Sequence, residues 1–343
     1  MDGVNNILLV VQCFTYNHEN YIGKCLDGFV NQKTNFEFVV IVHDDASTDN
    51  TAQIVRDYAD KYPNIIQPIL EAENQYSKGT DIQVKIVNDV TRGYKPKYIA
   101  LCEGDDFWID PYKLQKQFDF MEQHPDYSLC HTDVLIYEDN KKKIKGRKGW
   151  MYNFSNIYLE HEHQDLFNDI MSIKYVFQPL TFFIRYESYN QIQPNTVTFM
   201  MGDMPLILDL SQKGKIKYLP VVTGIYNHHL GSATRNPYTR SQFNFSIVEM
   251  KIYYCKKYHY QISEKLIAEY RINKEILERS GFKPRCLFPD LVQKPYDKSN
   301  HSSNNNSLWK EVLSSISSKI NILGLILLNN TYYFFMCKLK KYI

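Results

Sequence analysis

The chain lacks the features that mark secreted, zinc-binding or nucleic-acid-binding proteins. Its seven cysteines are an odd number and form no Cys-x-x-Cys pair, so we expect reduced, mostly buried thiols and no zinc. Forty Lys and Arg against 38 Asp and Glu leave a formal net charge of only +2, which argues against a nucleic-acid partner. Met1–Asn6 carries an acid where a secretion signal would be basic, and the apolar run after it is too short to span a membrane. We therefore expect a cytoplasmic protein.

Glycine is absent from the turn after the first predicted strand. Residues 7–12 read as that strand, and Cys13-Phe14-Thr15-Tyr16-Asn17 follows it. A nucleotidyltransferase with an α/β sheet would normally have a glycine-rich phosphate-binding loop directly after its first strand. The missing glycines count against that class of enzyme.

The order of apolar runs and helical patterns predicts an α/β domain followed by helices. Apolar strands alternate with amphipathic helices over residues 7–130, which is the pattern of a parallel sheet with crossover connections. We expect strands at 7–12, 36–42, 65–70 and 98–101, and helices near 22–30, from 47 to about 58, over 80–90 and over 112–124. Further on we expect a strand at 177–185, a helix at 204–213, one or two strands at 216–226 and one long helix at 241–279.

Acidic residues follow two of the predicted strands. The run Glu103-Gly104-Asp105-Asp106 comes directly after the strand 98–101, and Asp44-Asp45 follows the strand 36–42. Like charges packed together raise one another's pKa unless a cation offsets them, and a hard divalent ion with oxygen ligands is the common solution. Because the ends of such strands meet at one edge of a parallel sheet, we expect both acidic segments to share a cleft.

Five segments, in this order, resemble the family-2 glycosyltransferases. Residues 11–19 resemble the family's opening strand with its Thr-Tyr-Asn turn, and residues 44–51 resemble its Asp-Asp-Gly-Ser-Thr-Asp block with Ala46 in the glycine position. Glu103-Gly104-Asp105 falls where the family has its Asp-x-Asp metal motif. Gly202-Asp203 and Tyr226-Asn227-His228-His229 resemble its catalytic-base and late-histidine segments. The resemblance covers residues 6–235.

The resemblance implies a fold and a reaction. The fold is the α/β GT-A fold, a Rossmann-like mixed sheet flanked by helices, here with a C-terminal helical extension. The implied enzyme is an inverting, metal-dependent hexosyltransferase that uses Mg²⁺ or Mn²⁺. It moves a sugar from a nucleotide-diphospho-sugar donor to a glycan or lipid-linked acceptor, in surface polysaccharide synthesis.

The resemblance also suggests donor-binding and metal-binding residues. Asp105 takes the second acidic position of the metal motif and is the best candidate ligand, with Glu103 in the first position and Asp106 beside them. Thr15, Asp44 and Asp45 match segments that contact the base and ribose of the donor. The structural alternative is that these carboxylates only cap turns and helices, an alternative that is strongest for Asp106. Ala46 replaces a glycine, so we expect an ordinary backbone conformation at this position.

Three residues are assigned to the reaction centre and the acceptor. Asp203 is the candidate general base, because a helix N-terminus would hold it ionised, and the alternative is a plain N-cap. His229 is a candidate ligand of the metal or the diphosphate, although Asn227 replaces the family's usual Arg, and a purely structural histidine is the alternative. Trp108 is expected either to contact the acceptor or to fill the core.

The sequence divides into a catalytic domain 1–240, a helical extension 241–296, a linker 297–307 and a tail 308–343. The linker is rich in Ser and Asn and has too little apolar area to fold. In the tail an apolar stripe from Trp309 to Leu327 precedes Lys338, Lys340 and Lys341. This pattern favours a helix on the inner membrane surface, and docking on the protein itself or on a partner is the alternative. The rival functions are a nucleotidyltransferase and a noncatalytic carbohydrate-binding module.

Overall fold

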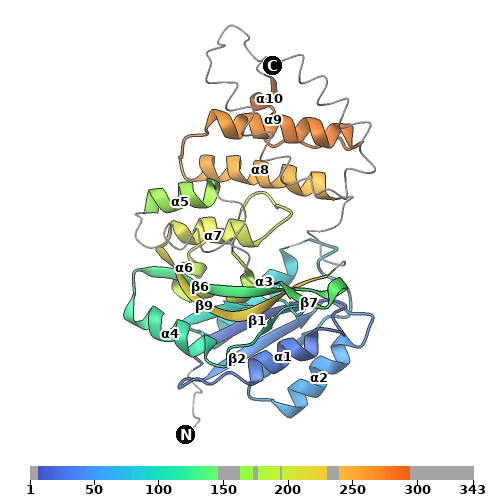
Figure 1. Ribbon diagram of the computed structural model, residues 1–343, viewed down its shortest axis with the longest axis vertical. Coiled ribbons are helices and arrows are strands. Elements are labelled where there is room, and N and C mark those ends of the chain that lie inside the picture. The colour runs from blue at the N-terminus through green and yellow to red at the C-terminus, as the bar shows by residue number, and fades with distance from the viewer. Residues whose placement is uncertain are drawn as a thin grey trace. The chain divides into compact units, whose positions relative to one another are not determined.

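A computed structural model describes residues 7–79, 81–145, 163–172, 177–193, 195–229 and 239–293 (Figure 1). The chain divides into two compact units, Met1–Leu230 and Gly231–Ile343. In the described residues the first unit contains a mixed sheet with flanking helices, and the second contains only helices. The predicted linker 297–307 and tail 308–343 lie outside these ranges and stay predictions.

The sheet of the first unit has nine strands in the described residues, with the order β3-β2-β1-β4-β8-β6-β9-β5 and β7 paired to β6. Strands β1 to β4 are parallel, β8 runs antiparallel to β4 and β6, and β9 runs parallel to β6. The bounds are β1 Leu9–Thr15, β2 Phe38–Asp44, β3 Ile66–Leu70, β4 Tyr98–Leu101, β5 Phe107–Trp108, β6 Tyr127–Glu138, β7 Lys143–Lys145, β8 Phe183–Arg185 and β9 Lys215–His228.

Helices cover this sheet. Those of the first unit are α1 Ile22–Val30, α2 Thr51–Lys61, α3 Ile82–Tyr94, α4 Lys113–Gln123, α5 His163–Ser172, α6 Tyr186–Asn190 and α7 Asp203–Ser211, with short 3-10 turns η1 at Asp139–Lys141 and η2 at Pro179–Thr181. Strands β1 and β2 are buried along almost their whole length, as expected for parallel strands covered on both faces. The sheet register places Thr15 opposite Asp44 and Asp44 opposite Leu70, so the ends of β1, β2 and β3 meet at one edge.

The parallel half of the sheet confirms the predicted strands, and the structure differs from the predictions at four other places. Helix α2 begins at Thr51 and not near residue 47, because residues 47–50 form a turn in which an Asp49 carboxylate oxygen accepts the Thr51 N–H at 2.9 Å. The predicted strand 177–185 is the turn η2 followed by the short strand β8. The long strand β6 was not predicted.

The fourth correction concerns the second unit. The predicted single helix 241–279 is two helices, α8 Arg240–Lys257 and α9 Glu264–Arg279, followed by α10 Asp290–Gln293. His259 adopts a φ of 59° after α8, and the Ser263 hydroxyl accepts the Leu266 N–H at 3.2 Å to cap α9. None of the described helices is long and apolar enough to cross a membrane.

Candidate active site

The acidic loop after β4 lies against the end of β1. The Cys102 N–H donates to the Gln12 carbonyl at 3.2 Å, and the Gly104 N–H donates to the Phe14 carbonyl at 2.9 Å. A Cβ atom at Gly104 would lie 2.6 Å from the Thr15 hydroxyl oxygen, well inside van der Waals contact. The loop can therefore approach β1 this closely only because residue 104 has no side chain.

This loop gathers three carboxylates. One oxygen each from Glu103, Asp105 and Asp106 lies within 4.8 Å of the others. An Asp106 oxygen accepts the Asn227 N–H at 2.7 Å, and the Asp105 Oδ2 lies 2.8 Å from the His229 Nε2. The other Asp105 oxygen, Oδ1, is buried and has no hydrogen-bond partner among the described residues. An unpartnered buried carboxylate oxygen within an acidic cluster fits a hard divalent cation, which takes oxygen ligands.

The protonation of the cluster follows from its burial and from the crowding of like charges. Burial and the charge of Asp105 raise the pKa of Asp106 well above the usual range, although the Asn227 N–H works in the opposite direction. The residue Glu103 is exposed overall, but its carboxyl group is poorly hydrated. This poor hydration and the charges of Asp105 and Asp203 raise the pKa of Glu103 to about 8. Burial also opposes ionisation of Asp105, but the hydrogen bond from His229 and other nearby charges outweigh it and lower its pKa.

Two aromatic residues that the sequence analysis did not single out complete this side of the site. The His18 Nδ1 lies 3.2 Å from the Thr15 hydroxyl, and its ring centroid lies 6.4 Å from that of His229. The Tyr21 ring stacks on His229 with centroids 5.1 Å apart, and its hydroxyl donates to Asp139 at 3.1 Å. His18 directly follows the Thr-Tyr-Asn turn, and this position next to a motif segment was the sequence signal that could have identified it.

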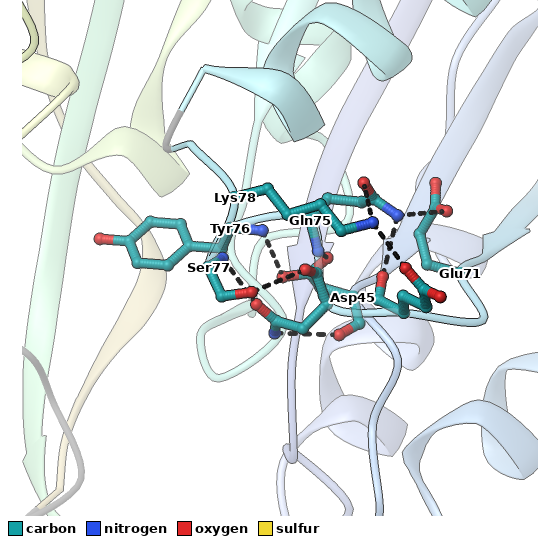
Figure 2. A network of polar contacts seen from close by, with 8 residues as sticks. Asp45, Glu71, Gln75, Tyr76, Ser77 and Lys78 are labelled. Carbon is teal, nitrogen blue, oxygen red and sulfur yellow. Dashed lines mark hydrogen bonds and ion pairs between the residues drawn. The ribbon is translucent and has the colours of Figure 1, made fainter.

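The carboxylates of Asp44 and Asp45 already have partners within the protein. Asp44 accepts the Ser47 N–H at 3.1 Å and also the Ser47 hydroxyl. Asp45 accepts the backbone N–H of Gln75 at 2.6 Å and that of Tyr76 at 3.1 Å, as Figure 2 shows. Both residues lie at the strand-end edge where they were predicted, but each carboxylate is engaged by the protein's own backbone.

The prediction for Ala46 is wrong. Its φ is 61°, in the left-handed region that favours glycine, and not the ordinary conformation expected. The turn is held on both sides, by Asp45 bonded to Gln75 and Tyr76 and by Asp44 bonded to Ser47. These bonds fix a conformation that an L-residue at this position adopts only at a cost in free energy.

Asp203 is the first residue of α7, with Gly202 as its N-cap. An Asp203 oxygen accepts the Met204 N–H at 2.9 Å. Burial raises the pKa of Asp203 to about 6, and two backbone hydrogen bonds that lower it only partly compensate. The helix N-terminus therefore does not dominate as predicted, but the carboxyl is still largely ionised at neutral pH. Its charge also contributes to the raised pKa of Glu103, which indicates that the acidic loop lies nearby.

The family model described as Glycosyl transferase family 2 matches residues 13–192. This chain belongs to glycosyltransferase family 2. An uncharacterized protein of Mycobacterium tuberculosis is 36% identical to this chain over 227 residues, which are 66% of this chain and 60% of that relative. The chain thus spans less than two thirds of the length of that relative. The poly(ribitol-phosphate) beta-N-acetylglucosaminyltransferase TarS of Staphylococcus aureus is 30% identical over 138 residues, which are 39% of this chain and 20% of TarS.

A solved structure of TarS has the same fold as this glycosyltransferase. The crystal structure of TarS residues 1–349 in complex with UDP-GlcNAc matches with a TM-score of 0.53 at 18% sequence identity, covering 90% of this chain and 80% of that chain. The match confirms the predicted GT-A fold with its mixed α/β sheet. The chain is therefore a member of glycosyltransferase family 2 with the fold that its sequence motifs indicated.

Trp108 lies in the core of this glycosyltransferase and is only 4% exposed. Its indole N–H donates to the Leu180 carbonyl at 2.7 Å, and its ring packs edge-on against Phe29 with centroids 4.8 Å apart. The Lys113 ammonium lies 4.2 Å from the indole ring centroid. The structure favours the core-packing alternative for Trp108, because a side chain this buried cannot stack on an acceptor sugar.

Lys113 is a third residue that the sequence analysis did not single out. The Lys113 side chain, on α4, is fully buried, and its terminal amine donates to the side-chain oxygen Oε1 of Gln117 at 2.7 Å. Gln117 in turn donates to the Thr181 backbone carbonyl at 2.8 Å. Burial lowers the pKa of Lys113 to about 7. The buried Lys113 amine thus lies over the ring of Trp108, which is two residues after the last carboxylate of the acidic loop.

Proposed function

We propose that this glycosyltransferase is metal-dependent and inverting, and moves a sugar from a nucleotide-diphosphate donor to a hydroxyl of a glycan or lipid-linked acceptor. The observation that carries the proposal is the buried, unpartnered Oδ1 of Asp105 within a cluster of three carboxylates. Like charges at this spacing stay ionised together only when a cation offsets them, and Mg²⁺ or Mn²⁺ with oxygen ligands suits them.

In this proposal Asp105 holds the metal, with Glu103, Asp106 and His229 around it. When bound, the metal stabilises the negative charge that develops on the departing diphosphate. The chain's own residues orient the ligands in advance: the Asn227 N–H fixes the Asp106 carboxylate, and the His229 ring fixes one oxygen of Asp105. Ligands held in this way need little rearrangement when a cation and donor bind.

Asp203 is the proposed general base, which takes the proton from the acceptor hydroxyl as the oxygen attacks the anomeric carbon. Its pKa of about 6 suits this role, because the carboxylate is mostly ionised at neutral pH yet basic enough to accept a proton. Direct attack by the acceptor on the face opposite the leaving diphosphate inverts the anomeric configuration. No covalent sugar-enzyme intermediate is needed.

Thr15, Asp44 and Asp45 form the proposed donor end, where β1 and β2 terminate side by side. This is the edge at which α/β sheets bind nucleotides. TarS, whose name states a poly(ribitol-phosphate) acceptor, supports a polymer with free hydroxyl groups as the acceptor. We also propose the domain division given above, with the tail 308–343 contacting the cytoplasmic face of the membrane.

The test is turnover of a panel of UDP-glucose, UDP-galactose, UDP-GlcNAc and GDP-mannose, measured as release of the nucleoside diphosphate. Activity should need Mg²⁺ or Mn²⁺, disappear with EDTA and return when the metal is restored. Asp105→Ala should lose metal-dependent turnover while its circular dichroism spectrum stays that of the wild type, because the cation loses a direct ligand.

The matched control is Asp89→Asn, which changes an exposed carboxylate of α3 that forms a surface ion pair with Arg92. It should keep wild-type activity. Full activity of Asp105→Ala, with unchanged Mn²⁺ binding measured by electron paramagnetic resonance, would remove the central claim. Tight donor binding by the wild type without any turnover would favour the carbohydrate-binding alternative.

A further inference from the structure

A basic turn lies at the sheet edge that carries the acidic loop. Strand β8 is antiparallel to both β4 and β6, and β9 is parallel to β6, so β4, β6 and β9 all run in the same direction. The turn η1 after β6 therefore leaves the sheet at the same edge as the loop after β4. It leads through Lys142 into β7 (Figure 1), where Lys143 pairs with Glu138, and Glu138 pairs on its other side with His228. Because neighbouring strands lie about 4.8 Å apart, the backbone of Lys143 is about 10 Å from that of His228.

Tyr21 fixes this turn beside the acidic cluster. Its hydroxyl donates to Asp139, the first residue of the turn, at 3.1 Å, and its ring stacks on His229 with centroids 5.1 Å apart. The His229 Nε2 in turn lies 2.8 Å from the Asp105 Oδ2. Within the turn, the Lys142 N–H donates to the Asp139 carbonyl at 3.2 Å. The lysines of the turn are therefore presented from a fixed backbone next to the candidate active site.

The turn carries three consecutive lysines, Lys141, Lys142 and Lys143. The Lys141 ammonium pairs with the Glu138 carboxylate at 3.0 Å. Lys142 and Lys143 are exposed, and neither forms an ion pair with an acidic residue in the part of the chain that the structure describes. A lysine ammonium is a compact charge with three hydrogen-bond donors and is a common partner of phosphate oxygens. Two such groups on one ordered turn suit an anionic phosphate group.

We propose that Lys142 and Lys143 bind a phosphate group of the acceptor. The inference rests on the proposed function. In the strand order, β4 lies between the proposed donor end at β1 and β2 and the strands β6 and β9. An acceptor that attacks opposite the leaving diphosphate approaches from the side away from the nucleotide, which is the side of this turn. Phosphate groups occur both in polyol-phosphate polymers and in the polyprenyl carriers of lipid-linked glycans, and both offer anionic oxygens to the same two lysines.

The first experiment follows the backbone amides of residues 139–143 by NMR in the metal-free protein, so that no metal at the acidic loop can bind phosphate. The probes are glycerol 3-phosphate for the polymer and farnesyl phosphate for the lipid carrier. At least one of them should shift these amides and reach saturation, and the tighter of the two identifies the source of the phosphate. Glycerol, and sulfate at the same ionic strength, should leave the amides unchanged. The absence of shifts with both phosphates, or equal shifts with sulfate, would overturn the proposal.

The second experiment repeats the titration with Lys142→Gln/Lys143→Gln. This variant should bind the better probe about tenfold more weakly, because each exposed ion pair contributes little and two are lost. Its Kd for the tightest of UDP, CDP and GDP with Mn²⁺, measured by calorimetry, should stay that of the wild type. The control Lys95→Gln/Lys213→Gln removes two exposed lysines at the opposite edge of the sheet, just before β4 and β9 begin, and should change neither affinity.

The two measurements separate the acceptor role from the donor role and from the proposed function itself. Weaker nucleotide binding by Lys142→Gln/Lys143→Gln with unchanged phosphate binding would assign the lysines to the donor diphosphate and overturn the proposal. A wild type that releases no nucleoside diphosphate from any donor would refute the proposed function, and with it the acceptor role of the turn. A wild type that turns over donor but shows no phosphate-dependent shifts would refute this inference alone.

Discussion

Replacing Lys113 by Met should change how the stability of the protein depends on pH. The Lys113 side chain is fully buried, and its pKa falls from 10.5 to about 7 because burial disfavours the charged form. At about 1.36 kcal/mol per pKa unit, holding this ammonium protonated inside the fold costs on the order of 5 kcal/mol. The hydrogen bond to Gln117 and the contact with the Trp108 ring do not remove that cost, since the pKa stays at about 7.

The direction of the pH effect follows from proton binding. Between pH 7 and 10 the unfolded chain keeps the Lys113 proton while the folded chain has largely lost it, so the free energy of unfolding rises with pH. The slope reaches about 1.4 kcal/mol per pH unit, and the total gain is roughly 3 kcal/mol over this range. Lys113→Met carries no such proton and should lack this contribution.

The assay is urea unfolding at intervals from pH 7 to pH 10 under reducing conditions. The stability of the wild type relative to Lys113→Met should increase steadily with pH, and the variant should compare best at pH 7. Lys116→Met, on the solvent side of the same helix, controls for the loss of a lysine from α4. Parallel pH curves for the wild type and Lys113→Met would refute the reasoning, since they would mean that Lys113 is not deprotonated in the fold.

Three further substitutions test the site and its surroundings. Asp203→Asn should retain donor binding but slow transfer by roughly 10²- to 10⁴-fold. It should also abolish the fall in kcat/KM below pH about 6 that the wild type shows. A proton NMR spectrum of the product with retained anomeric configuration would contradict the role of Asp203 as the base. Gly104→Ala should destabilise the fold by about 1 to 3 kcal/mol and weaken Mn²⁺ binding, because the new Cβ atom would collide with Thr15. Gly23→Ala is the control, since a Cβ atom at Gly23 has no other atom within 4 Å, and it should change neither stability nor Mn²⁺ binding. Ala46→Gly should raise the unfolding free energy by about 0.5 to 1 kcal/mol, since its φ is 61°, and an unchanged melting temperature would argue against backbone strain there.

The sequence predicted those parts of the fold whose signal is local. Apolar strands alternating with helices identified β1 to β4, and the acidic run after β4 identified the loop that gathers three carboxylates. Strand β6 was not predicted because its middle residues, His131, Thr132 and Asp133, are polar yet buried, so the apolar pattern is interrupted inside the strand. The end of α8 was not predicted because no glycine or proline follows it as a helix-ending signal.

The roles within the site depended on contacts that sequence patterns do not encode. The engagement of Asp45 by the N–H groups of Gln75 and Tyr76 depends on where a turn about 30 residues away folds back. Hydrogen bonds of this kind involve backbone atoms, which every residue type offers, so the composition of the turn gives no signal. The left-handed conformation of Ala46 has the same origin, because the bonds on either side of it impose the turn.

The acidic loop is completed by a strand far along the chain. Asp106 receives its hydrogen bond from a residue 121 positions later, and Asp105 meets a histidine 124 positions later, at the end of β9. Closing a loop of this length costs conformational entropy before its contacts can form. During synthesis, the first 214 residues lack β9 altogether and cannot assemble the cluster with its partners. In the proposed enzyme, the acidic loop therefore gains these partners only after β9 has been made, and a partly made chain would lack the oriented carboxylates that the proposed reaction needs.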